Sequence, residues 1–383
     1  MDRSDITLAN WRQRPFSRAA FQAVETLIPV AEIAPAGATP MPVGDPRGML
    51  RRTLRMPDLS MSVAEWLDAS HGDLLTVLKD GKPVFDWAAQ DRDFARPHIA
   101  FSISKSLTAL TAGALAAEGR LAFSDPVTRF VPEAAGTAFG DCTLQNLLDM
   151  TVSIDFAEAY LDRGGQHDRY RQAMRWNPAP DGVTPPSLAD FLLTLQMDAH
   201  PHGHLFYYAS PVTDLLGLAV ERAAGEPLAA LMARLLWEPM GLGGPASITT
   251  DGVGTSRAAG GVSLTVRDLA AIGEMVRNGG MCAGRRIVPA SFIDDTRFGG
   301  DGAPWSRSDW TLMFPEGVYR NCWYQTHNET GALCAIGIHG QWLWIDFERG
   351  VTIAKFSSQP LPEDEPLTRL NIEALQALSA ALA

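Results

Sequence analysis

The chain has 383 residues, of which 46% are hydrophobic and 20% are charged, and its formal net charge is -12. This length suits one large domain or two closely packed ones, and the composition is that of an ordinary globular protein. The negative charge argues against a nucleic-acid-binding protein, which needs a basic surface, and against binding to anionic lipid.

The start of the chain, residues 1–6, lacks the basic first residues and the apolar stretch of a secretory signal. No run of about 18 apolar residues predicts a membrane span. The four cysteines could form two disulfides, but without a leader we favour free buried thiols. They are scattered at Cys142, Cys282, Cys322 and Cys334. We expect a cytoplasmic protein, provided that no leader has been lost.

The first part of the chain is predicted to lie over a domain surface and to lead into a β-hairpin. Residues 1–60 are rich in Pro and Arg, which indicates an irregular segment. Two apolar runs, 74–78 and 83–87, flank Asp80-Gly81, a strong hairpin signal. A helix should then run from Ser102 to Gly119, because glycine is the usual residue at a helix C-terminus.

The middle of the chain, 120–255, is predicted to be mainly helical. Thr143 can cap a short amphipathic helix whose leucines have the i, i+3, i+4 spacing. The segment 157–187 reads as a long irregular loop and therefore as a candidate lid or substrate loop. Two more helices are expected at 212–224 and 227–236.

The C-terminal third returns to strands and closes with a helix at 366–382. Short β runs occupy 335–338, 342–346 and 351–356. Strands at both ends of the chain with helices between them predict an α+β fold. We expect an α/β sandwich domain from 1–100 and 256–383, with a mainly helical domain, 101–255, inserted into it.

One lysine has an unusual setting. Only four of the 32 basic residues are lysines, and the strand pattern places Lys79, Lys82 and Lys355 at a surface. Lys105 instead follows Ser102 by three residues in a helix of small and apolar residues. Arginine could not serve as a base there, because only an amine can have its pKa brought near neutral pH.

A serine and a lysine at this spacing share one face of a helix, so the amine can take the proton of the hydroxyl. Burial would lower the lysine pKa, and the free N–H groups at the helix start favour negative charge. The bare S-x-x-K pattern is weak, being expected about once by chance in such a chain. The alternative is a lysine that snorkels from the helix edge. Tyr208, before the helix at 212, could relay a proton to a leaving group, although a Tyr-Tyr pair alone indicates core packing.

Together these motifs resemble the serine β-lactamase and penicillin-binding protein superfamily. The motifs are Ser102-x-x-Lys105, Tyr208-x-Ser210 and the Gly337 strand. The similarity runs from about residue 70 to the end and is greater to its 6-aminohexanoate-dimer hydrolase branch of amidases and esterases. That similarity is carried by the blocks 102–107, 148–155, 260–263 with 267–269, and 337–341. It implies an antiparallel sheet flanked by helices, an inserted mainly helical domain, and an active site between them.

The resemblance also implies roles for individual residues. Ser102 would be the acylated nucleophile, Lys105 its base and Tyr208 the proton donor to the leaving group. The N–H groups of Ser102 and Ile338 would form the oxyanion hole. Gly337 would leave room for a substrate carbonyl. No metal and no other cofactor are expected.

Substrate contacts follow less directly from the resemblance. Tyr160 matches a family tyrosine on a mobile loop that closes over substrate. Asp168 lies near a position where a family carboxylate can hold a free amine of the substrate, with a solvated loop charge as an equal alternative. Ala259 stands where relatives can carry a polar substrate contact, which counts against efficient turnover of the nylon dimer.

We therefore expect a serine hydrolase that cleaves small linear amides or carboxylic esters, with no nucleic-acid or membrane partner and with a homodimer left open. A β-lactamase or DD-peptidase is the alternative, but two motifs differ. Ser210 stands at the position of the usual Asn, and Ala335 and Ile336 stand at the Lys and Thr positions of the Lys-Thr-Gly motif, so the cation that binds a β-lactam carboxylate is missing. A non-catalytic ligand-binding descendant should have lost Ser102, Lys105 or Tyr208, and all three are present.

Other site classes are disfavoured. A metallohydrolase would need a site at His200, His202 and His204, but their alternate spacing is not H-E-x-x-H and no carboxylate completes it. An α/β-hydrolase would need a G-x-S-x-G elbow, which the sequence lacks. The tryptophans could wall an apolar cleft, although core packing is favoured for most of them. They are Trp305, Trp310, Trp323, Trp342 and Trp344.

Overall fold

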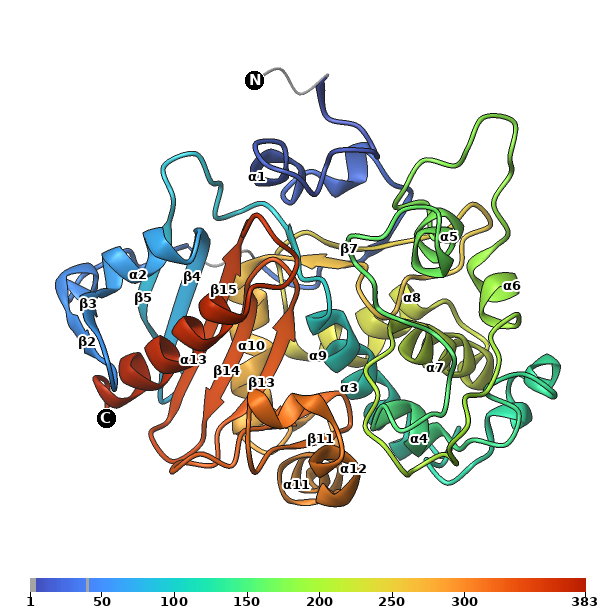
Figure 1. Cartoon of the computed structure of the whole chain (residues 1–383). Helices are drawn as coiled ribbons and strands as arrows, with labels where there is room; N and C mark the ends of the chain where they lie inside the picture. Colours follow the sequence, from blue (N-terminus) through green and yellow to red (C-terminus); the bar gives the residue numbers. More distant parts are fainter. Residues whose placement is uncertain (1–4, 39–40) are drawn as a thin grey trace.

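The fold combines two main antiparallel sheets with helices, as a computed structural model describing residues 5–38 and 41–383 shows (Figure 1). The larger sheet has seven strands in the order β11-β12-β13-β14-β15-β4-β5. Their bounds are β4 Gly72–Lys79, β5 Lys82–Ala88, β11 Val318–Arg320, β12 Trp323–Gln325, β13 Leu333–Gly337, β14 Gln341–Asp346 and β15 Val351–Ser357. The predicted α+β class is confirmed.

The smaller sheet has the order β1-β7-β8-β6 and joins the N-terminal segment to the start of the serine-bearing helix. Its strands are β1 Val30–Ile33, β6 His98–Ile99, β7 Ala246–Thr249 and β8 Val262–Leu264. Two short strand pairs lie outside it: β2 Thr53–Arg55 with β3 Ser60–Ser62, and β9 Met281–Cys282 with β10 Arg285–Arg286. Since β7 pairs with both β1 and β8, strand pairing connects the predicted domains.

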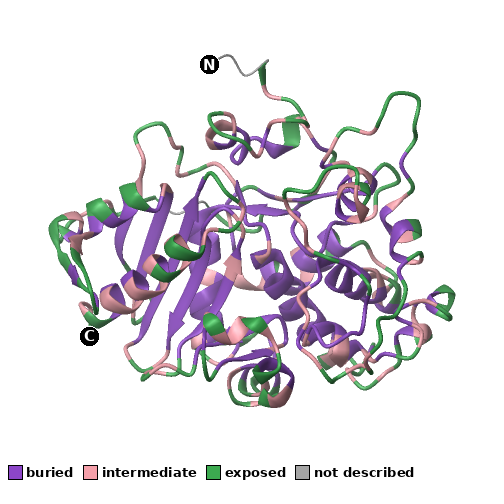
Figure 2. Cartoon of the chain, in the orientation of Figure 1, coloured by how far each residue is buried: buried purple, intermediate pink, exposed green. Residues whose placement is uncertain are grey.

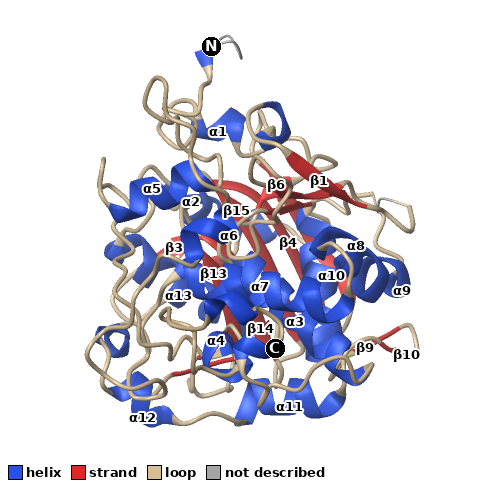
Figure 3. Ribbon diagram, turned by 90° about the vertical axis from the view of Figure 1, so that its right-hand side faces the viewer, coloured by secondary structure: helices blue, strands red, loops and turns tan. Residues whose placement is uncertain are grey.

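Helices cover both faces of the larger sheet and gather beside it. Figure 1 shows α13 in front of the sheet and α10 behind it, with α3 to α9 mostly at the side, and Figure 3 shows the strands between helices. The helices are α1 Ser17–Ala20, α2 Val63–Ala69, α3 Ile103–Ala117, α4 Leu144–Leu148, α5 Gln166–Ala173, α6 Leu188–Leu192, α7 Ser210–Ala224, α8 Leu228–Met232, α9 Glu238–Met240, α10 Val266–Arg277, α11 Ala290–Phe298, α12 Gly302–Ser306 and α13 Glu365–Ala380.

Several local predictions are confirmed because short-range chemistry fixes them. The β4–β5 hairpin turns through Asp80 and Gly81, which both have positive φ. Helix α3 ends at Ala117, and Gly119 has φ of +70°. Thr143 caps α4 by accepting a hydrogen bond from the N–H of Asn146, whose side chain accepts one from Thr143 in return.

Both faces of the central strands are buried, which explains one wrong prediction. Every residue of β14 and β15 is buried, as the continuous purple strands of Figure 2 show. A strand covered on both faces has no solvent side. Lys355 of β15 is therefore 0% exposed rather than at a surface, with its Nζ 2.5 Å from Ser357 Oγ and 5.6 Å from the Trp66 ring centroid.

Two further predictions were partly wrong. Residues 5–38 and 41–60 do more than cover a domain surface, because Trp11 and Phe21 are completely buried and pack against Phe101. Residues 1–4 and 39–40 lie outside the described residues. The predicted loop 157–187 contains α5.

The cysteines are free, and the helices are too short or too polar to span a membrane, over the described ranges. All four cysteines are free thiols, three of them buried and Cys282 half-buried. Over the described ranges no helix combines the length and the apolar character needed to cross a bilayer.

Candidate active site

The serine sits at a tight junction between β6 and α3. Phe101 has φ of +45°, a conformation that a bulky side chain rarely adopts and that commonly marks a functional site. Its ring is held by Trp11, Phe21 and Trp176, with centroid distances of 6.2, 5.0 and 6.0 Å. This aromatic cluster fixes the backbone just before Ser102, at the N-terminal end of α3.

The Lys105 amine lies at the centre of a compact polar group. Its Nζ is 2.9 Å from Ser102 Oγ, 3.1 Å from Ser210 Oγ and 2.8 Å from the carbonyl oxygen of Ala259. A neutral amine has two N–H bonds and one lone pair. Donation to Ala259 and Ser210 leaves that lone pair for the hydroxyl proton of Ser102, so the contacts match those of a general base.

Burial adjusts the basicity of this amine. Lys105 is 1% exposed, and burial lowers its pKa from 10.5 to about 7. The charge of Glu158 opposes this change, whereas the charge of Arg257 adds to it. An amine with a pKa near neutrality is partly unprotonated at physiological pH and can accept a proton.

Tyr208 lies beside the serine and the lysine. Its ring centroid is 4.8 Å from Lys105 Nζ, and the ring packs against Trp310 at 5.1 Å. Burial raises its pKa above 10, which hydrogen bonding to Ser102 partly opposes. The phenol therefore keeps its proton near neutral pH and is available as a donor. The structure thus brings together all three residues singled out from the sequence.

Gly337 is the last residue of β13 and Ile338 follows it, and both line the same cavity as Ser102. A Cβ on Gly337 would lie 2.6 Å from the carbonyl oxygen of Ala100 and 3.1 Å from the side chain of Gln341. The glycine is therefore required by the close approach of the chain before α3 to β13. This physical reason differs from the clearance for a substrate carbonyl that we expected.

The sequence did not reveal the buried group that positions Ala259. Asp214 of α7 accepts the Ala259 N–H at 2.8 Å and the hydroxyl of Tyr170 at 2.5 Å, and it pairs with Arg257. Asp214 is 2% exposed, so removing Arg257 would leave an uncompensated buried charge. The sequence signal for it was an aspartate followed by a run of apolar and small residues in α7.

Glu158 was also missed. Its Oε1 accepts the N–H of Ser210, and its Oε2 is 3.6 Å from Nδ1 of His167. Burial lowers the pKa of His167 to about 4, so its ring is neutral near pH 7. Among the surrounding carboxylates, Glu158 has the largest effect on the pKa of Lys105. It also lines a small chamber that contains Ser102.

The cavity in front of Ser102 has a volume of about 70 Å³, and aromatic side chains line it. Of the five tryptophans noted from the sequence, Trp310 and Trp342 line it, whereas Trp305, Trp323 and Trp344 are core residues. The cleft hypothesis therefore applies to two of the five, and core packing to the other three.

The expected substrate-binding residues take three different positions. Tyr160 lines the Ser102 cavity and its two neighbours, so it stands where these spaces meet. Ala259 lines the chamber beside Ser102, where its backbone holds Lys105. Asp168, at the start of α5, lies in the larger neighbouring cavity rather than beside the serine.

Of the three alternating histidines, His202 fixes the loop that carries them. His202 accepts the N–H of Ser153 at Nδ1 and lies 2.9 Å from Asp141 through Nε2. The rings of His200 and His204 are 6.2 Å apart. Within the described residues, no group of three metal-ligating side chains converges there. The contacts of His202 give it a role in fixing the loop.

Comparison with known proteins gives consistent matches. A model of the Beta-lactamase family matches residues 63–377. The chain is 34% identical over 383 residues to a 6-aminohexanoate-dimer hydrolase from Paenarthrobacter ureafaciens, covering 98% of this chain and 94% of that protein. It is 29% identical over 198 residues to the esterase EstB from Burkholderia gladioli, covering 45% and 44%. A solved structure from Bacillus anthracis, provisionally named a 6-aminohexanoate-dimer hydrolase, has a TM-score of 0.89 at 23% identity, covering 100% and 98%.

Proposed function

Because the chain belongs to the Beta-lactamase family, we propose that it is a hydrolase in which Ser102 attacks the carbonyl carbon of a small linear amide or ester. The observation that carries this proposal is the buried Lys105 amine, 2.9 Å from Ser102 Oγ and with a pKa of about 7. A base so placed activates a serine without a histidine.

The proposed reaction has two halves. As Ser102 Oγ bonds to the carbonyl carbon, its proton passes to Lys105, and the N–H groups of Ser102 and Ile338 stabilise the oxyanion. Tyr208 gives a proton to the leaving nitrogen or oxygen as the scissile bond breaks, and the proton on Lys105 then passes to the Tyr208 phenolate, which restores both groups. Water then attacks the acyl-enzyme, with Lys105 again as the base, and releases the acid and free Ser102.

The other predicted residues have supporting roles in this proposal. Gly337 allows α3 and β13 to approach, so that the two oxyanion donors meet. Ala259 orients Lys105 through its carbonyl oxygen, and Tyr160 closes the substrate space. The reacting atoms would lie between the sheet domain, 1–100 and 256–383, and the helical domain, 101–255. Free thiols support a reducing compartment such as the cytoplasm.

The proposed substrate class rests on two observations: where this sequence departs from the β-lactamase motifs, and what the names of its relatives say they hydrolyse. Ala335 and Ile336 leave β13 without the cation that would bind the carboxylate of a β-lactam. The names of two relatives, a 6-aminohexanoate-dimer hydrolase and an esterase, supply a linear amide and an ester as models.

The test compares wild type with Ser102→Ala on short p-nitrophenyl esters, linear anilides and nitrocefin. We expect hydrolysis of esters and anilides by wild type, with an acyl-enzyme detectable by mass spectrometry, and loss of both in Ser102→Ala. Ester hydrolysis that survives in Ser102→Ala would refute the mechanism. Fast nitrocefin hydrolysis without activity on linear substrates would refute the substrate class.

A further inference from the structure

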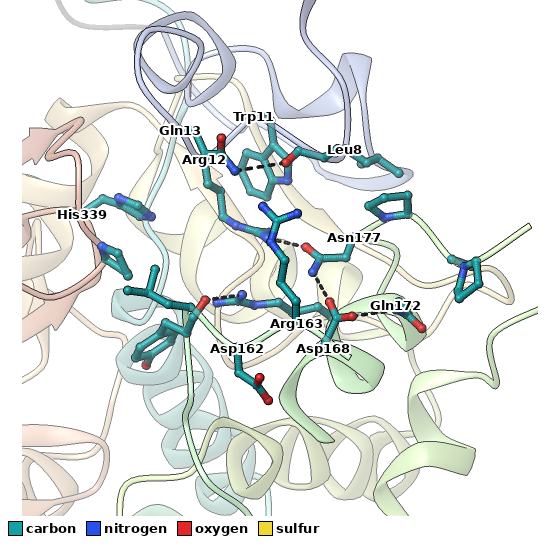
Figure 4. A pocket seen from close by; sticks show the side chains of 18 of the residues that line it. Leu8, Trp11, Arg12, Gln13, Asp162, Arg163, Asp168, Gln172, Asn177 and His339 are labelled. Carbon is teal, nitrogen blue, oxygen red and sulfur yellow. Dashed lines mark hydrogen bonds between the residues drawn. The ribbon is translucent and has the colours of Figure 1, made fainter. Parts of the chain in front are cut away.

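A larger cavity of about 440 Å³ lies next to the Ser102 chamber (Figure 4). The N-terminal segment, the chain after Tyr160 and helix α5 form its walls. Arg12, Tyr160 and Arg171 line both this cavity and the chamber that contains Ser102, so the two spaces adjoin. These three side chains form the wall between the two spaces, and a substrate bound at Ser102 would reach the larger cavity by passing between them.

Three arginines from two distant parts of the chain converge in this cavity. Arg12 comes from the N-terminal segment, Arg163 from the loop before α5, and Arg171 from α5 itself. Figure 4 shows Arg12 and Arg163 reaching into the space from opposite sides. The pKa of Arg12 is lowered well below 12.5 by burial and by the charges of Arg171 and Arg163, and the charge of Asp168 opposes this change in part. Three like charges gathered in one cavity oppose one another unless an anion joins them.

Among the described residues, none of these arginines forms an ion pair with a carboxylate. The charge of Asp168 nevertheless acts on Arg12, and the charges of Glu158 and Asp168 act on Arg171. Across residues 5–38 and 41–383, no acidic oxygen lies within 4.0 Å of the guanidinium nitrogens of Arg12, Arg163 or Arg171 (by contrast, Arg257 pairs with Asp214). Arg12 donates to the carbonyl oxygen of Trp176 at 3.2 Å and to the Asn177 side chain, both neutral acceptors. Arg171 donates to the carbonyl oxygen of Tyr160 at 2.6 Å. Arginine forks with neutral acceptors retain their capacity for a bidentate anion.

The carboxylate expected to bind an amine is already occupied. Asp168 accepts hydrogen bonds from Asn177 Nδ2 at 2.5 Å, Gln172 Nε2 at 3.0 Å and the Gly164 N–H at 3.1 Å. Because Asn177 in turn accepts from Arg12, Asp168 acts as a positioning residue for that arginine. These three bonds use most of the acceptor capacity of the carboxylate, and a substrate ammonium would also meet three arginines.

The charges in the cavity favour a singly charged anion. Three guanidinium groups face two carboxylates, Asp162 and Asp168, which leaves one net positive charge. His339 adds none near pH 7, because burial lowers its pKa to about 3. In the adjoining chamber, the charge of Glu158 acts on Arg171 as well as on Lys105 and Arg257, so the excess positive charge in the cavity is at most one. A carboxylate matches the single charge better than a dianionic phosphate.

The position of Tyr208 indicates which end of the substrate reaches this cavity. Tyr208 and Trp310 line the cavity of about 70 Å³ in front of Ser102. Tyr208 does not line the chamber on the other side of Ser102, which adjoins the arginine cavity. If Tyr208 protonates the leaving group, the leaving group lies on its side of Ser102 and the acyl chain on the other. The arginines then face the far end of the acyl chain.

We propose that the preferred substrates are amides or esters whose acyl chain ends in a carboxylate held by Arg12, Arg163 and Arg171, that is, half-amides or half-esters of dicarboxylic acids. This inference rests on the proposed function and names its substrate class. Hydrolysis breaks the C–N or C–O bond of the acyl group. The hydroxyl of water remains on the dicarboxylic acid, and a proton goes to the released amine or alcohol.

The test measures binding, so that it does not depend on turnover. Calorimetry with Ser102→Ala compares three anilides of equal length: adipic acid monoanilide, hexananilide and 6-aminohexananilide. We expect the carboxylate compound to bind about 10- to 100-fold more tightly than the neutral one, the range for a charge-assisted hydrogen bond, and the ammonium compound most weakly. Glutaric and suberic monoanilides extend the series in chain length. Equal affinities at every length, or tightest binding of the ammonium compound, would overturn the proposal.

Arginine variants in the Ser102→Ala background identify the residues responsible. Arg163→Gln, an exposed position, and Arg12→Gln should each reduce the preference for the carboxylate several-fold and leave hexananilide affinity unchanged. Arg169→Gln is the matched control, because Arg169 is an exposed arginine of α5 that does not line the cavity. An equal loss in Arg169→Gln would refute the assignment. If wild type hydrolyses none of the anilides or esters, the proposed function fails, whereas the binding order still decides this inference.

Discussion

Replacing Lys105 with methionine tests the base and its pKa together. At pH 7 a lysine with a pKa of about 7 is half unprotonated, whereas a lysine at the usual 10.5 would be only about 0.03% unprotonated. Methionine has similar length but no basic nitrogen. We expect Lys105→Met to reduce kcat/KM by about 10²- to 10⁴-fold, the usual contribution of general base catalysis.

The wild-type pH profile follows from the same pKa. Log kcat/KM for a p-nitrophenyl ester should rise with pH up to about 7 and then level off, because only the unprotonated amine accepts the serine proton. A flat profile between pH 6 and 9, or a rise that continues to pH 10, would refute the reasoning. So would more than a tenth of wild-type activity in Lys105→Met.

Lys355→Met is the matched control, because this second lysine is also buried and its pKa is also lowered to about 7. For both lysines the folded-state pKa lies below the unfolded value, so the folded state loses stability as pH falls from 10.5 to about 7. Each lysine contributes up to about 5 kcal/mol to this loss. Each methionine variant should therefore become more stable relative to wild type as pH falls through this window, measured by urea unfolding. Only Lys105→Met should lose activity.

Three further variants test the surroundings of the lysine. Tyr208→Phe should reduce anilide hydrolysis by about 10²- to 10⁴-fold but p-nitrophenyl ester hydrolysis far less, because p-nitrophenolate leaves without a proton; equal losses would contradict proton donation. Asp214→Asn should cost about 3–5 kcal/mol in urea unfolding, since it leaves Arg257 buried without its counter-charge; an unchanged unfolding midpoint would exclude this role. Gly337→Ala should cost about 1–3 kcal/mol and lower kcat/KM, because its Cβ would press on Ala100; wild-type kinetics would show that the strand can shift harmlessly.

Features with a local physical cause could be predicted from the sequence. The Asp80-Gly81 hairpin depends on two adjacent residues that accept positive φ, and the start of α4 depends on one capping threonine. The reach of Lys105 to Ser102 depends only on helix geometry. The family resemblance supplied Tyr208, which lies more than 100 residues away in the sequence.

Features that depend on long-range packing could not be predicted. The strand pattern of β15 gives no sign that helices cover both of its faces, so Lys355 was placed at the surface. The burial of Trp11 likewise depends on its meeting Phe101, about 90 residues further along the chain.

The sequence by itself indicated the class of chemistry that we propose, because Ser102 and Lys105 lie one helical turn apart and stand with further motifs that resemble one hydrolase superfamily. Only the tertiary structure decided the electrostatic setting of that chemistry. It buried Lys105 and so lowered its pKa, and it placed Asp214 behind Ala259. It also brought Arg12 together with two arginines of the distant segment 163–171 in one cavity, which no local pattern encodes because each arginine alone is an ordinary polar residue.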